Sequence, residues 1–387
     1  MLSNMERSTL ENNKRILRIG VDVSMLSEQP TGIGRYTYEI LSRAVSMGHE
    51  WFLYSHRPLV FGDWTHKNVH LRTSHMPKRM LRMLWMQTAV PFLASRDHLD
   101  LFWSPAHRLP SLLPHRIAKV VTIHDLVWKY AGDSMRPLSR WLDATLMPQA
   151  VRMADKVITV SNHTANDVLK EMPYAEGKIF PISLGVSNLK PVAELSSLET
   201  IGVDAPYFLF VGTLEPRKNL VGLIEAYSKL PIDVRCSALL VIVGGKGWGG
   251  VDIAAIASTF GVQDSIRVLG YVTDAQLATL YTFAIFLAMP SFYEGFGLPL
   301  LEAMSRGTPV LTSNCASMPE VAGDSGLLVD PHDVSSISKA LSAMLTDKTL
   351  VRGFRDKSIV NAQRFSWDLA VQKTLNIIED AAKAHKK

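Results

Sequence analysis

Short apolar runs alternate along this chain with amphipathic stretches of helical length. In the first half, β-branched and apolar residues predict strands at 16–23, 51–55, 69–72, 101–103, 120–124 and 157–160. Apolar residues at helical spacing predict helices at 34–47, 77–93, 136–153 and 162–172. This alternation is typical of βα units, which build a parallel sheet covered by helices on both faces.

The second half repeats the pattern. Its predicted strands lie at 207–211, 239–243, 266–269, 285–289, 310–312 and 326–329. Its predicted helices lie at 219–230, 251–260, 274–282, 298–306 and 334–345, and a last helical pattern at 367–386 has no strand after it. Between the halves, the stretch 187–206 contains Pro191 and Pro206 and lacks a strand pattern, as expected of a connection between domains.

The pattern therefore predicts an α/β protein of two domains with a cleft between two sheets, where ligands bind at the carboxyl ends of strands. We expect a first domain at 15–190, a second at 200–365 and a C-terminal helix at 366–387. The polar residues 1–14 lack the apolar segment of a secretory signal and are expected to form a disordered leader. No apolar stretch approaches the roughly 18 residues of a spanning helix.

Composition changes this picture little. Apolar residues make up 47% and charged residues 20% of the chain, as in ordinary globular proteins. The two cysteines, Cys236 and Cys315, are too few for a disulfide framework or a structural zinc site. The net charge of +5 permits an anionic partner without selecting one, and no basic and aromatic stripe indicates nucleic-acid binding.

The strongest chemical signal is the segment 290–304, which follows an apolar strand and opens a helix. Gly295 and Gly297 allow a tight turn, and Pro299 suits a first helical turn, so the free amides there form a site for an anion. Glu294 and Glu302 flank the site, and both can face a ligand. The alternative is that Glu294 is a solvated loop residue and Glu302 a capping or salt-bridge partner. The surrounding glycines and proline favour the ligand site over this alternative.

A second signal lies at 210–220. An apolar strand ends at Gly212, and Arg217 and Lys218 follow just before a helix. A guanidinium has two fixed donors and an ammonium is a point charge, so the pair suits a diphosphate at the mouth of the strand. Two solvated cations at a helix start are the alternative, which the helix dipole disfavours without an anion nearby.

Two weaker signals lie in the first half. Gly32 and Gly34 follow the first strand in a loop that is either a plain turn or a phosphate loop, since it matches neither GxGxxG nor a P-loop. His124 and Asp125 end a strand, where the pair could contact a substrate hydroxyl or help proton transfer; the alternative is a satisfied buried histidine. The chain contains no Asp-x-Asp, no HExxH and no Gly-x-Ser-x-Gly, so we expect no metal site.

Together these segments resemble the retaining glycosyltransferases of family 4, from about residue 15 to 385. The resemblance rests on the Glu294 to Glu302 pair in its Gly-Phe-Gly-Leu-Pro frame, on Gly-Thr-Leu-Glu-Pro-Arg-Lys-Asn, on Thr-Gly-Ile-Gly-Arg and on Thr-Ile-His-Asp. It implies the GT-B fold, in which two Rossmann-like domains face each other across a cleft and the C-terminal helix crosses back to the first domain. Lys218 matches the family's lysine, whereas Thr213 stands where the family often has arginine, so Arg217 is expected to replace it.

The resemblance also implies roles for these residues. Glu302 would bind the ribose of a nucleotide sugar, Glu294 the hydroxyls of the hexose, and Arg217 and Lys218 the diphosphate. His124 would lie beside the sugar as a further catalytic group. The other expected contacts are Asp125 supporting that strand end, the amides of Phe296, Gly297 and Leu298 with Gly212 and Thr213 at the diphosphate, Gly270 and Tyr271 at the base, and Gly32 and Gly34 where the first domain closes over the ligands.

The expected reaction moves a hexose, with mannose from GDP-mannose as the first choice, to a lipid-linked glycan in polysaccharide or O-antigen synthesis. No cofactor, metal or nucleic acid is expected, and the alternative is a nonhydrolysing nucleotide-sugar epimerase of the same fold. A cytoplasmic enzyme, peripheral on the inner membrane, fits the basic and apolar segment 76–85, through Lys78, Arg79 and Arg82. The alternative for that segment is an ordinary packing helix.

Overall fold

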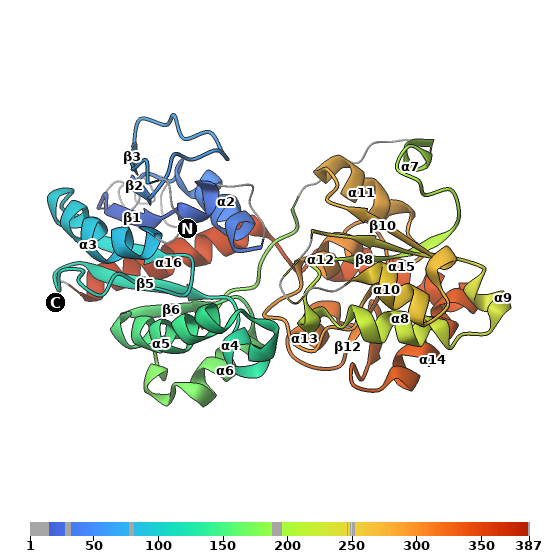
Figure 1. The fold of residues 1–387 in the computed structure, drawn as a ribbon. Helices are drawn as coiled ribbons and strands as arrows, with labels where there is room; N and C mark the ends of the chain where they lie inside the picture. Colours follow the sequence, from blue (N-terminus) through green and yellow to red (C-terminus); the bar gives the residue numbers. More distant parts are fainter. Residues whose placement is uncertain are drawn as a thin grey trace, which may run out of the picture. The chain divides into compact units, whose positions relative to one another are not determined.

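The computed structural model describes residues 15–27, 32–76, 81–187, 196–245, 247, 249 and 252–385. It contains two sheets, and the first has the order β3-β2-β1-β4-β5-β6-β7, with parallel pairing from β3 to β5 (Figure 1). Its strands are β1 (Arg18–Asp22), β2 (Glu50–Ser55), β3 (Val69–Thr73), β4 (Leu101–Ser104), β5 (Ala118–Ile123), β6 (Lys156–Thr159) and β7 (Ile179–Pro181). The short edge strand β7 was not predicted, because it has only three residues and ends in a proline.

The first half supplies the helices α2 (Gly32–Ala44), α3 (Leu81–Arg96), α4 (Val127–Tyr130), α5 (Pro137–Met153) and α6 (Asn162–Glu171), with 3₁₀ turns η1 (Ser24–Ser27), η2 (Gly132–Ser134) and η3 (Pro173–Ala175). Their starts follow local chemistry. The Ser161 hydroxyl caps α6 by accepting a hydrogen bond from the Thr164 amide at 3.0 Å. In α2, Tyr36, Ile40 and Leu41 form the buried face, at the spacing that predicted the helix.

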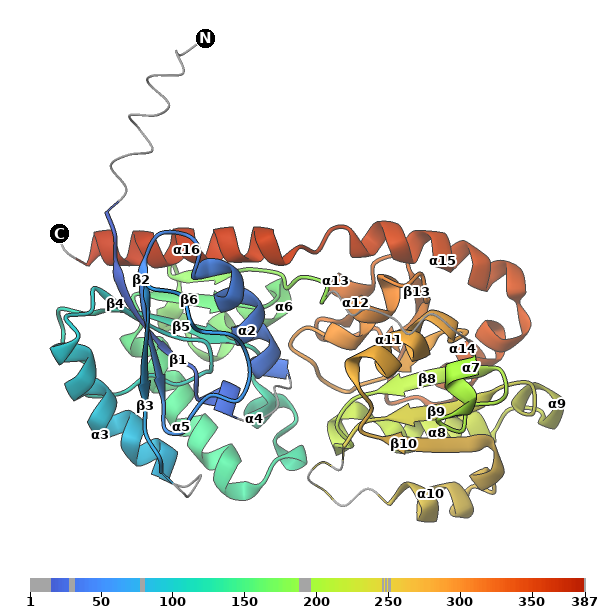
Figure 2. The same cartoon turned by 90° about the horizontal axis from the view of Figure 1, so that it is seen from above.

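The second sheet is parallel with the order β10-β9-β8-β11-β12-β13 (Figure 2, yellow-green to orange). Its strands are β8 (Tyr207–Val211), β9 (Leu239–Val243), β10 (Ile266–Gly270), β11 (Leu287–Met289), β12 (Val310–Ser313) and β13 (Gly326–Val329). The chain leaves β8 toward β9 on one side and returns as β11 on the other. The loops after β8 and β11 therefore diverge at a topological switch point, where open α/β sheets bind ligands.

The helices of the second half are α7 (Ser196–Glu199), α8 (Leu220–Ser228), α9 (Ile232–Arg235), α10 (Ile253–Thr259), α11 (Asp274–Phe283), α12 (Leu298–Met304), α13 (Met318–Ala322), α14 (Val334–Thr346), α15 (Lys348–Ala362) and α16 (Trp367–Ala384), with 3₁₀ turns η4 (Pro216–Lys218) and η5 (Gln263–Ser265). Phe208 and Phe210 of β8 share a buried core with Leu223 of α8 and Leu341 of α14. These apolar contacts fix the sheet that carries the loops after β8 and β11.

The fifteen-residue helix α15 was not predicted, because its apolar face is thin. Val351 and Ala362 are its only buried apolar residues among those described, and Gly353 lowers helix propensity in its middle. The signal that marks it is Asp347, whose side chain caps the helix by accepting from the Leu350 amide at 2.9 Å.

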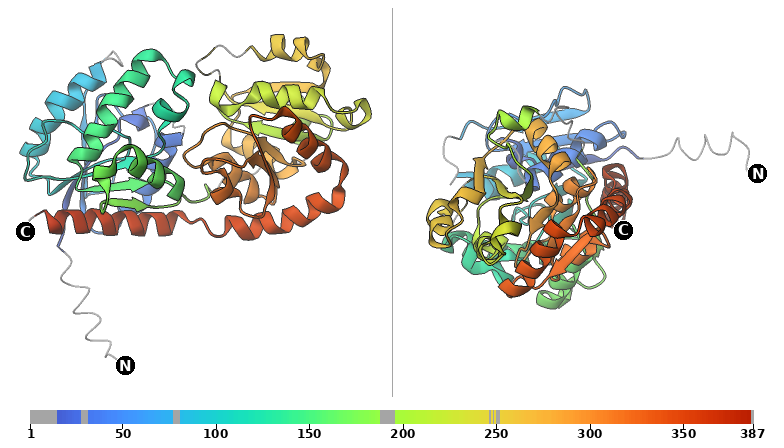
Figure 3. Two further views of the ribbon diagram at one scale, coloured as in Figure 1. Left: turned by 90° about the horizontal axis from the view of Figure 1, so that it is seen from below. Right: turned by 90° about the vertical axis from the view of Figure 1, so that its right-hand side faces the viewer.

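The described residues divide into two compact units that do not coincide with the two sheets. One unit contains the described residues of 15–122, 149–158 and 371–385. The other contains the described residues of 123–148 and 159–370. The segments that follow β5 and β6 thus belong to the same unit as the second sheet. The helix α16 is the long red helix in Figure 3. In the first unit, the carboxylate of its Glu379 lies 3.1 Å from Nε2 of the buried His49. The predicted leader 1–14 lies outside the described residues.

Candidate active site

The loops after β8 and β11 bring together two cations and a carboxylate at the switch point of the second sheet. Arg217 Nη1 lies 2.8 Å from Glu294 Oε2, and Lys218 Nζ forms an ion pair with Glu294 Oε1. The side chains of Lys218 and Glu294 are each 9% exposed. Glu294 follows Lys218 by 76 residues and Arg217 by 77. The two strongest sequence signals therefore form one buried cluster.

Asn219 turns the chain between η4 and α8 and so fixes Lys218. Its backbone is left-handed (φ 57°), a conformation that asparagine tolerates better than most residues. Its side chain is buried and donates to the Pro331 carbonyl at 2.7 Å. Gly222 leaves room for it, since a Cβ there would lie 2.4 Å from Asn219 Oδ1. Sequence reasoning missed this residue, although an asparagine directly before a helix is a common signal for such a turn.

Close backbone packing places Gly212 beside Lys218. A Cβ on Gly244, which follows β9, would lie 1.9 Å from the Gly212 carbonyl oxygen, so only glycine fits there. Lys218 Cε would lie 3.4 Å from a Cβ on Gly212. Thr213 is exposed next to this pair. The structure thus brings Gly212 and Thr213 to the predicted diphosphate site.

The charges in this cluster set one another's protonation. Burial disfavours the charged form of Glu294, but Arg217 and Lys218 outweigh it and lower the pKa of Glu294 to about 2. Burial lowers the pKa of Lys218, which Glu294 opposes. Burial also acts against the charge of Arg217, yet Glu294, Asp125 and Glu215 raise its pKa above the ordinary value. A carboxylate and two cations thus occupy a site from which water is largely excluded, where electrostatic interactions are strong.

The lowered pKa of Glu294 predicts a pH-dependent stability. Because the pKa in the folded protein lies below the ordinary value of 4.5, the contribution of Glu294 is complete above pH 4.5 and is lost as the pH falls through about 2. Urea unfolding should show the wild type more stable than Glu294→Gln, with a difference that narrows by about 2 kcal/mol between pH 6 and pH 3. A difference independent of pH would contradict a buried, ionised Glu294.

The predicted anion turn and Glu302 lie directly after this cluster. Gly297 caps α12 with a left-handed backbone (φ 99°), and a Cβ there would lie 2.8 Å from Met318 Cε. Within the described residues, the amides of Phe296, Gly297 and Leu298 have no hydrogen-bond acceptor. Glu302 is buried in α12, where its Oε2 accepts from the Tyr281 hydroxyl at 3.0 Å. The side chain of Phe296 is buried, so only its backbone is offered to a ligand.

His124 and Asp125 lie against the same loop. A Cβ on Gly295 would lie 1.8 Å from the His124 carbonyl oxygen and 3.0 Å from Asp125 Cβ, so the two segments pack with no room for a side chain. The Thr164 hydroxyl lies 3.2 Å from both the His124 and the Gly295 carbonyl oxygens. The structure therefore brings both predicted residues of the first sheet's β5 end to the loop that carries Glu294.

The remaining predicted residues lie at the end of β10 and at the start of α2. Gly270 ends β10, with its carbonyl accepting from the Gly244 amide at 2.8 Å, and the next side chain, Tyr271, is 68% exposed. Gly32 and Gly34 form the first turn of α2 in the other compact unit, so they are part of a helix and not of an open loop.

The segment predicted to meet a membrane is only partly described. Lys78 and Arg79 lie outside the described residues. Arg82 is not a free cation, because its Nη2 lies 3.2 Å from Asp22 Oδ2 at the end of β1. Trp85 is buried, so it is part of the packing face of α3.

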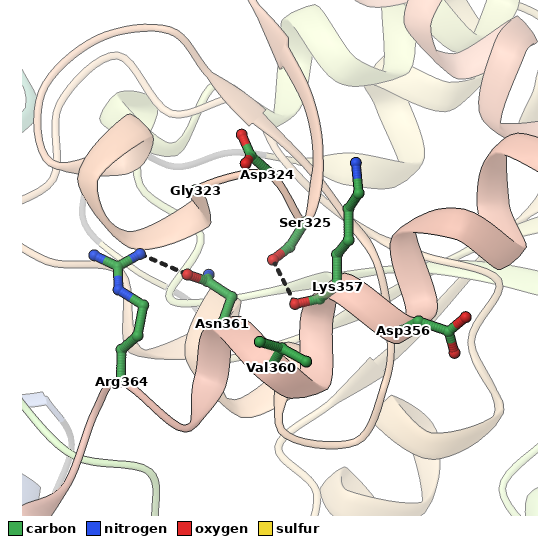
Figure 4. A pocket seen from close by; sticks show the side chains of 8 residues that line it. All are labelled: Gly323, Asp324, Ser325, Asp356, Lys357, Val360, Asn361 and Arg364. Carbon is green, nitrogen blue, oxygen red and sulfur yellow. Dashed lines mark hydrogen bonds between the residues drawn. The ribbon is translucent and has the colours of Figure 1, made fainter.

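A pocket of about 490 Å³ lies away from these residues, where the turn at 323–325 meets α15 (Figure 4). Its walls include Arg364, which donates to Asn361 Oδ1 at 2.6 Å, and Ser325, whose hydroxyl lies 3.4 Å from the Lys357 carbonyl. None of its lining residues belongs to the Lys218 and Glu294 cluster. Across the part of the chain that the structure describes, no three histidine, cysteine, aspartate or glutamate side chains group as metal ligands.

A charged cluster at the switch point of the second parallel sheet, beside helix-start amides without an acceptor among the described residues, defines an α/β protein of two sheets with a site suited to an anion. Comparison with known proteins gives the family. Residues 30–188 match the model of Glycosyltransferase Family 4, and residues 194–364 match that of Glycosyl transferases group 1. The chain belongs to these glycosyltransferases.

Two relatives and two solved structures show the extent of the similarity. The chain is 34% identical to the Escherichia coli O-antigen chain mannosyltransferase B over 73% of this chain and 75% of that protein. It is 31% identical to the E. coli serotype-specific mannosyltransferase WbdA over 64% of this chain, but it spans only 32% of WbdA. Sucrose-phosphate synthase from Thermosynechococcus elongatus has a TM-score of 0.77 at 21% identity, covering 95% of this chain and all of that one. Anabaena HepE, in complex with UDP and glucose, has a TM-score of 0.72 at 18% identity, covering 94% and 100%.

These findings confirm the resemblance and the predicted GT-B fold of two Rossmann-like, parallel-sheet domains, and they identify the chain as a glycosyltransferase. Among the described helices, none combines the length and the hydropathy that crossing a membrane requires.

Proposed function

We propose that this glycosyltransferase moves mannose from GDP-mannose, with retention of configuration and without a metal ion, to a hydroxyl of a lipid-linked glycan in polysaccharide synthesis. The observation that carries the proposal is the buried cluster of Arg217, Lys218 and Glu294. It combines two cations suited to a diphosphate with a carboxylate suited to sugar hydroxyls. The E. coli relative named as an O-antigen chain mannosyltransferase supports the choice of sugar and product.

In the proposed complex the diphosphate takes the place of Glu294 as the partner of the two cations. The amides of Phe296, Gly297 and Leu298 would donate to the same phosphates, while Glu302 accepts from the ribose hydroxyls and Tyr271 lines the base. Glu294, released from its ion pairs, would accept hydrogen bonds from the hexose. Such donors and charges are preorganised for the leaving group, so they stabilise its developing negative charge without a large rearrangement.

The proposed chemical step is a front-face displacement. The acceptor oxygen bonds to the anomeric carbon on the side from which the nucleoside diphosphate leaves, and the bond between that carbon and the phosphate oxygen breaks. The acceptor proton passes to the departing phosphate oxygen. His124, which lies against the Glu294 loop, would contact the hexose. Asp125 would support the strand end, and its negative charge would stabilise the charged form of Arg217.

A thermal-shift comparison of GDP-mannose with UDP-glucose tests the donor. We expect GDP-mannose at a hundredfold excess over its Kd to stabilise the protein by about 2.7 kcal/mol, and UDP-glucose to give a much smaller shift. Equal shifts, or a larger one with UDP-glucose, would contradict the proposed donor. An assay with GDP-mannose and no acceptor separates the alternative activity, since only an epimerase would convert the mannose into an altered sugar.

A lipid-linked acceptor also implies contact with a membrane, which we place at α3. Its Leu84 and Phe92 are 57% and 69% exposed. The double variant L84S/F92S should bind anionic liposomes about tenfold more weakly than the wild type in flotation assays, because two apolar side chains are lost from the membrane face. Val360→Ser, which changes an equally exposed apolar residue on α15, serves as the control. Equal flotation of all three proteins would reject this surface.

A further inference from the structure

Tyr293, the residue before Glu294, is held at both ends. Its hydroxyl donates to Asp167 Oδ2 at 2.6 Å and accepts from the Leu126 amide at 3.2 Å. Its carbonyl oxygen accepts from Arg217 Nη1 at 3.2 Å, and the same nitrogen pairs with Glu294. The ring therefore points away from the charged cluster while the backbone touches it.

The hydroxyl end of Tyr293 is a strong anchor. Tyr293 is 5% and Asp167 8% exposed, and the Tyr293 ring stacks on Tyr130 with centroids 5.3 Å apart. His163 Nε2 lies 3.2 Å from Asp167 Oδ2, on the next turn of α6. Burial raises the pKa of Tyr293, and Asp167 raises it further, so the phenol keeps its proton and remains a donor. A neutral donor bonded to a buried carboxylate is among the stronger hydrogen bonds in proteins.

The Glu294 loop needs such an anchor. It connects β11 to α12 without regular structure, and Gly295 and Gly297 give its backbone more conformational freedom than other residues would. The Ser161 hydroxyl donates to the Gly295 carbonyl at 2.8 Å, and the Ser317 hydroxyl donates to the Glu294 carbonyl at 2.9 Å. Side chains and not a backbone ladder therefore hold this loop, and Tyr293 provides the hold on the side that precedes Glu294. A carboxylate that has to meet particular sugar hydroxyls loses much of its effect when displaced by about 1 Å.

We propose that Tyr293 and Asp167 are positioning residues that hold Glu294 in place for the donor hexose. This proposal rests on the role of Glu294 in the function proposed above. Neither side chain needs to touch a substrate. Their effect reaches the reaction through the backbone at Tyr293 and the neighbouring carboxylate, so it should appear in the steps that involve the hexose and not in binding of the nucleoside diphosphate.

The test compares Tyr293→Phe with Tyr207→Phe. Tyr207 is also buried, and its hydroxyl donates to the Leu280 carbonyl at 2.8 Å, so the control loses a buried hydrogen bond away from the loop. Y293F should lower kcat for mannose transfer about 10- to 100-fold, with the Kd for GDP changed less than about twofold. Y207F should leave kcat and the Kd for GDP near their wild-type values. A kcat for Y293F equal to that of Y207F, or a parallel loss of GDP binding, would overturn the proposal.

Asp167 provides a second route should Y293F not fold. Asp167→Asn keeps an oxygen that can accept from the Tyr293 hydroxyl, whereas Asp167→Ala removes it. D167A should show the loss of kcat and D167N should recover most of it, and equal rates in the two variants would overturn the proposal. Glu294→Gln, assayed alongside, separates the two ideas. Wild-type transfer by E294Q would reject the proposed function, while a large loss in E294Q with normal Y293F and D167A would reject only the positioning role.

Discussion

Lys218→Ala should lower the rate of hexose transfer by about 100- to 1000-fold, because it removes a buried cation from the site proposed for the leaving diphosphate. The Kd for GDP should rise as well, since the ammonium would pair with the diphosphate both before and after transfer. Steady-state transfer rates and calorimetric titration with GDP measure the two effects. Lys229→Ala is the matched control, because Lys229 forms an exposed pair with Glu225 at 2.8 Å outside the cluster.

Near-normal transfer by K218A would contradict the assignment of this site. A folding check accompanies the assay, since loss of one partner from a buried ion pair can cost about 3–5 kcal/mol of stability. The wild-type enzyme assayed in EDTA shows whether Arg217 and Lys218 provide the positive charge that the diphosphate needs. We expect full activity there, and a strict requirement for a divalent ion would contradict the metal-independent mechanism.

The sequence predicted the central strands well because strands such as β8 and β9 are short, apolar and almost entirely buried. The bounds of β8, β9 and β13 agree with the predicted ones, and a glycine or a polar residue follows each of these strands directly. Prediction failed where burial is slight. The helix α15 buries few apolar side chains, and β7 is a three-residue edge strand. Hydrophobic periodicity reports burial, so it is weak where an element has little of it.

The residues of the site were predicted to meet one donor molecule, but not to contact one another. Local patterns identified Arg217, Lys218 and Glu294 as residues facing an anionic ligand, and the family resemblance implied the sugar contact of Glu294. Neither showed that the two cations pair with that carboxylate, because this contact arises from the order of strands, which places β8 next to β11. The contact between Asp167 and Tyr293 was missed for the same reason: the two residues are 126 positions apart, and although Tyr293 lies within the predicted segment that contains Glu294, nothing near Asp167 marks it as the partner.

This pairing changes how the cations are expected to work. Arg217 and Lys218 are not free charges in this structure, because they form ion pairs with Glu294 and Glu215. The donor therefore has to compete with Glu294 for both cations. That competition lowers the affinity for the nucleotide, but it also keeps the cations ordered and delivers a released carboxylate to the hexose at the moment when the diphosphate binds.

Glu294→Gln should slow hexose transfer and at the same time tighten the binding of GDP. Transfer should fall by about 100- to 1000-fold, because the amide cannot match an ionised carboxylate as a partner for the sugar hydroxyls. The Kd for GDP should fall by about 3- to 10-fold, since Arg217 and Lys218 no longer have to leave a carboxylate before they meet the diphosphate. Rapid-quench transfer rates and calorimetry with GDP measure both quantities on the same preparation.

Glu215→Gln is the matched control for the two opposite effects expected of Glu294→Gln, which are tighter GDP binding and slower transfer. Glu215 lies 2.9 Å from Arg217 Nε, but it is on the loop after β8 and is not proposed to meet the sugar. E215Q should therefore tighten GDP binding slightly and leave transfer close to wild type. Weaker GDP binding in E294Q, in parallel with slower transfer, would mean that Glu294 serves only to hold the two cations in place. Tighter binding together with slower transfer is the result that requires Glu294 to act on the hexose itself.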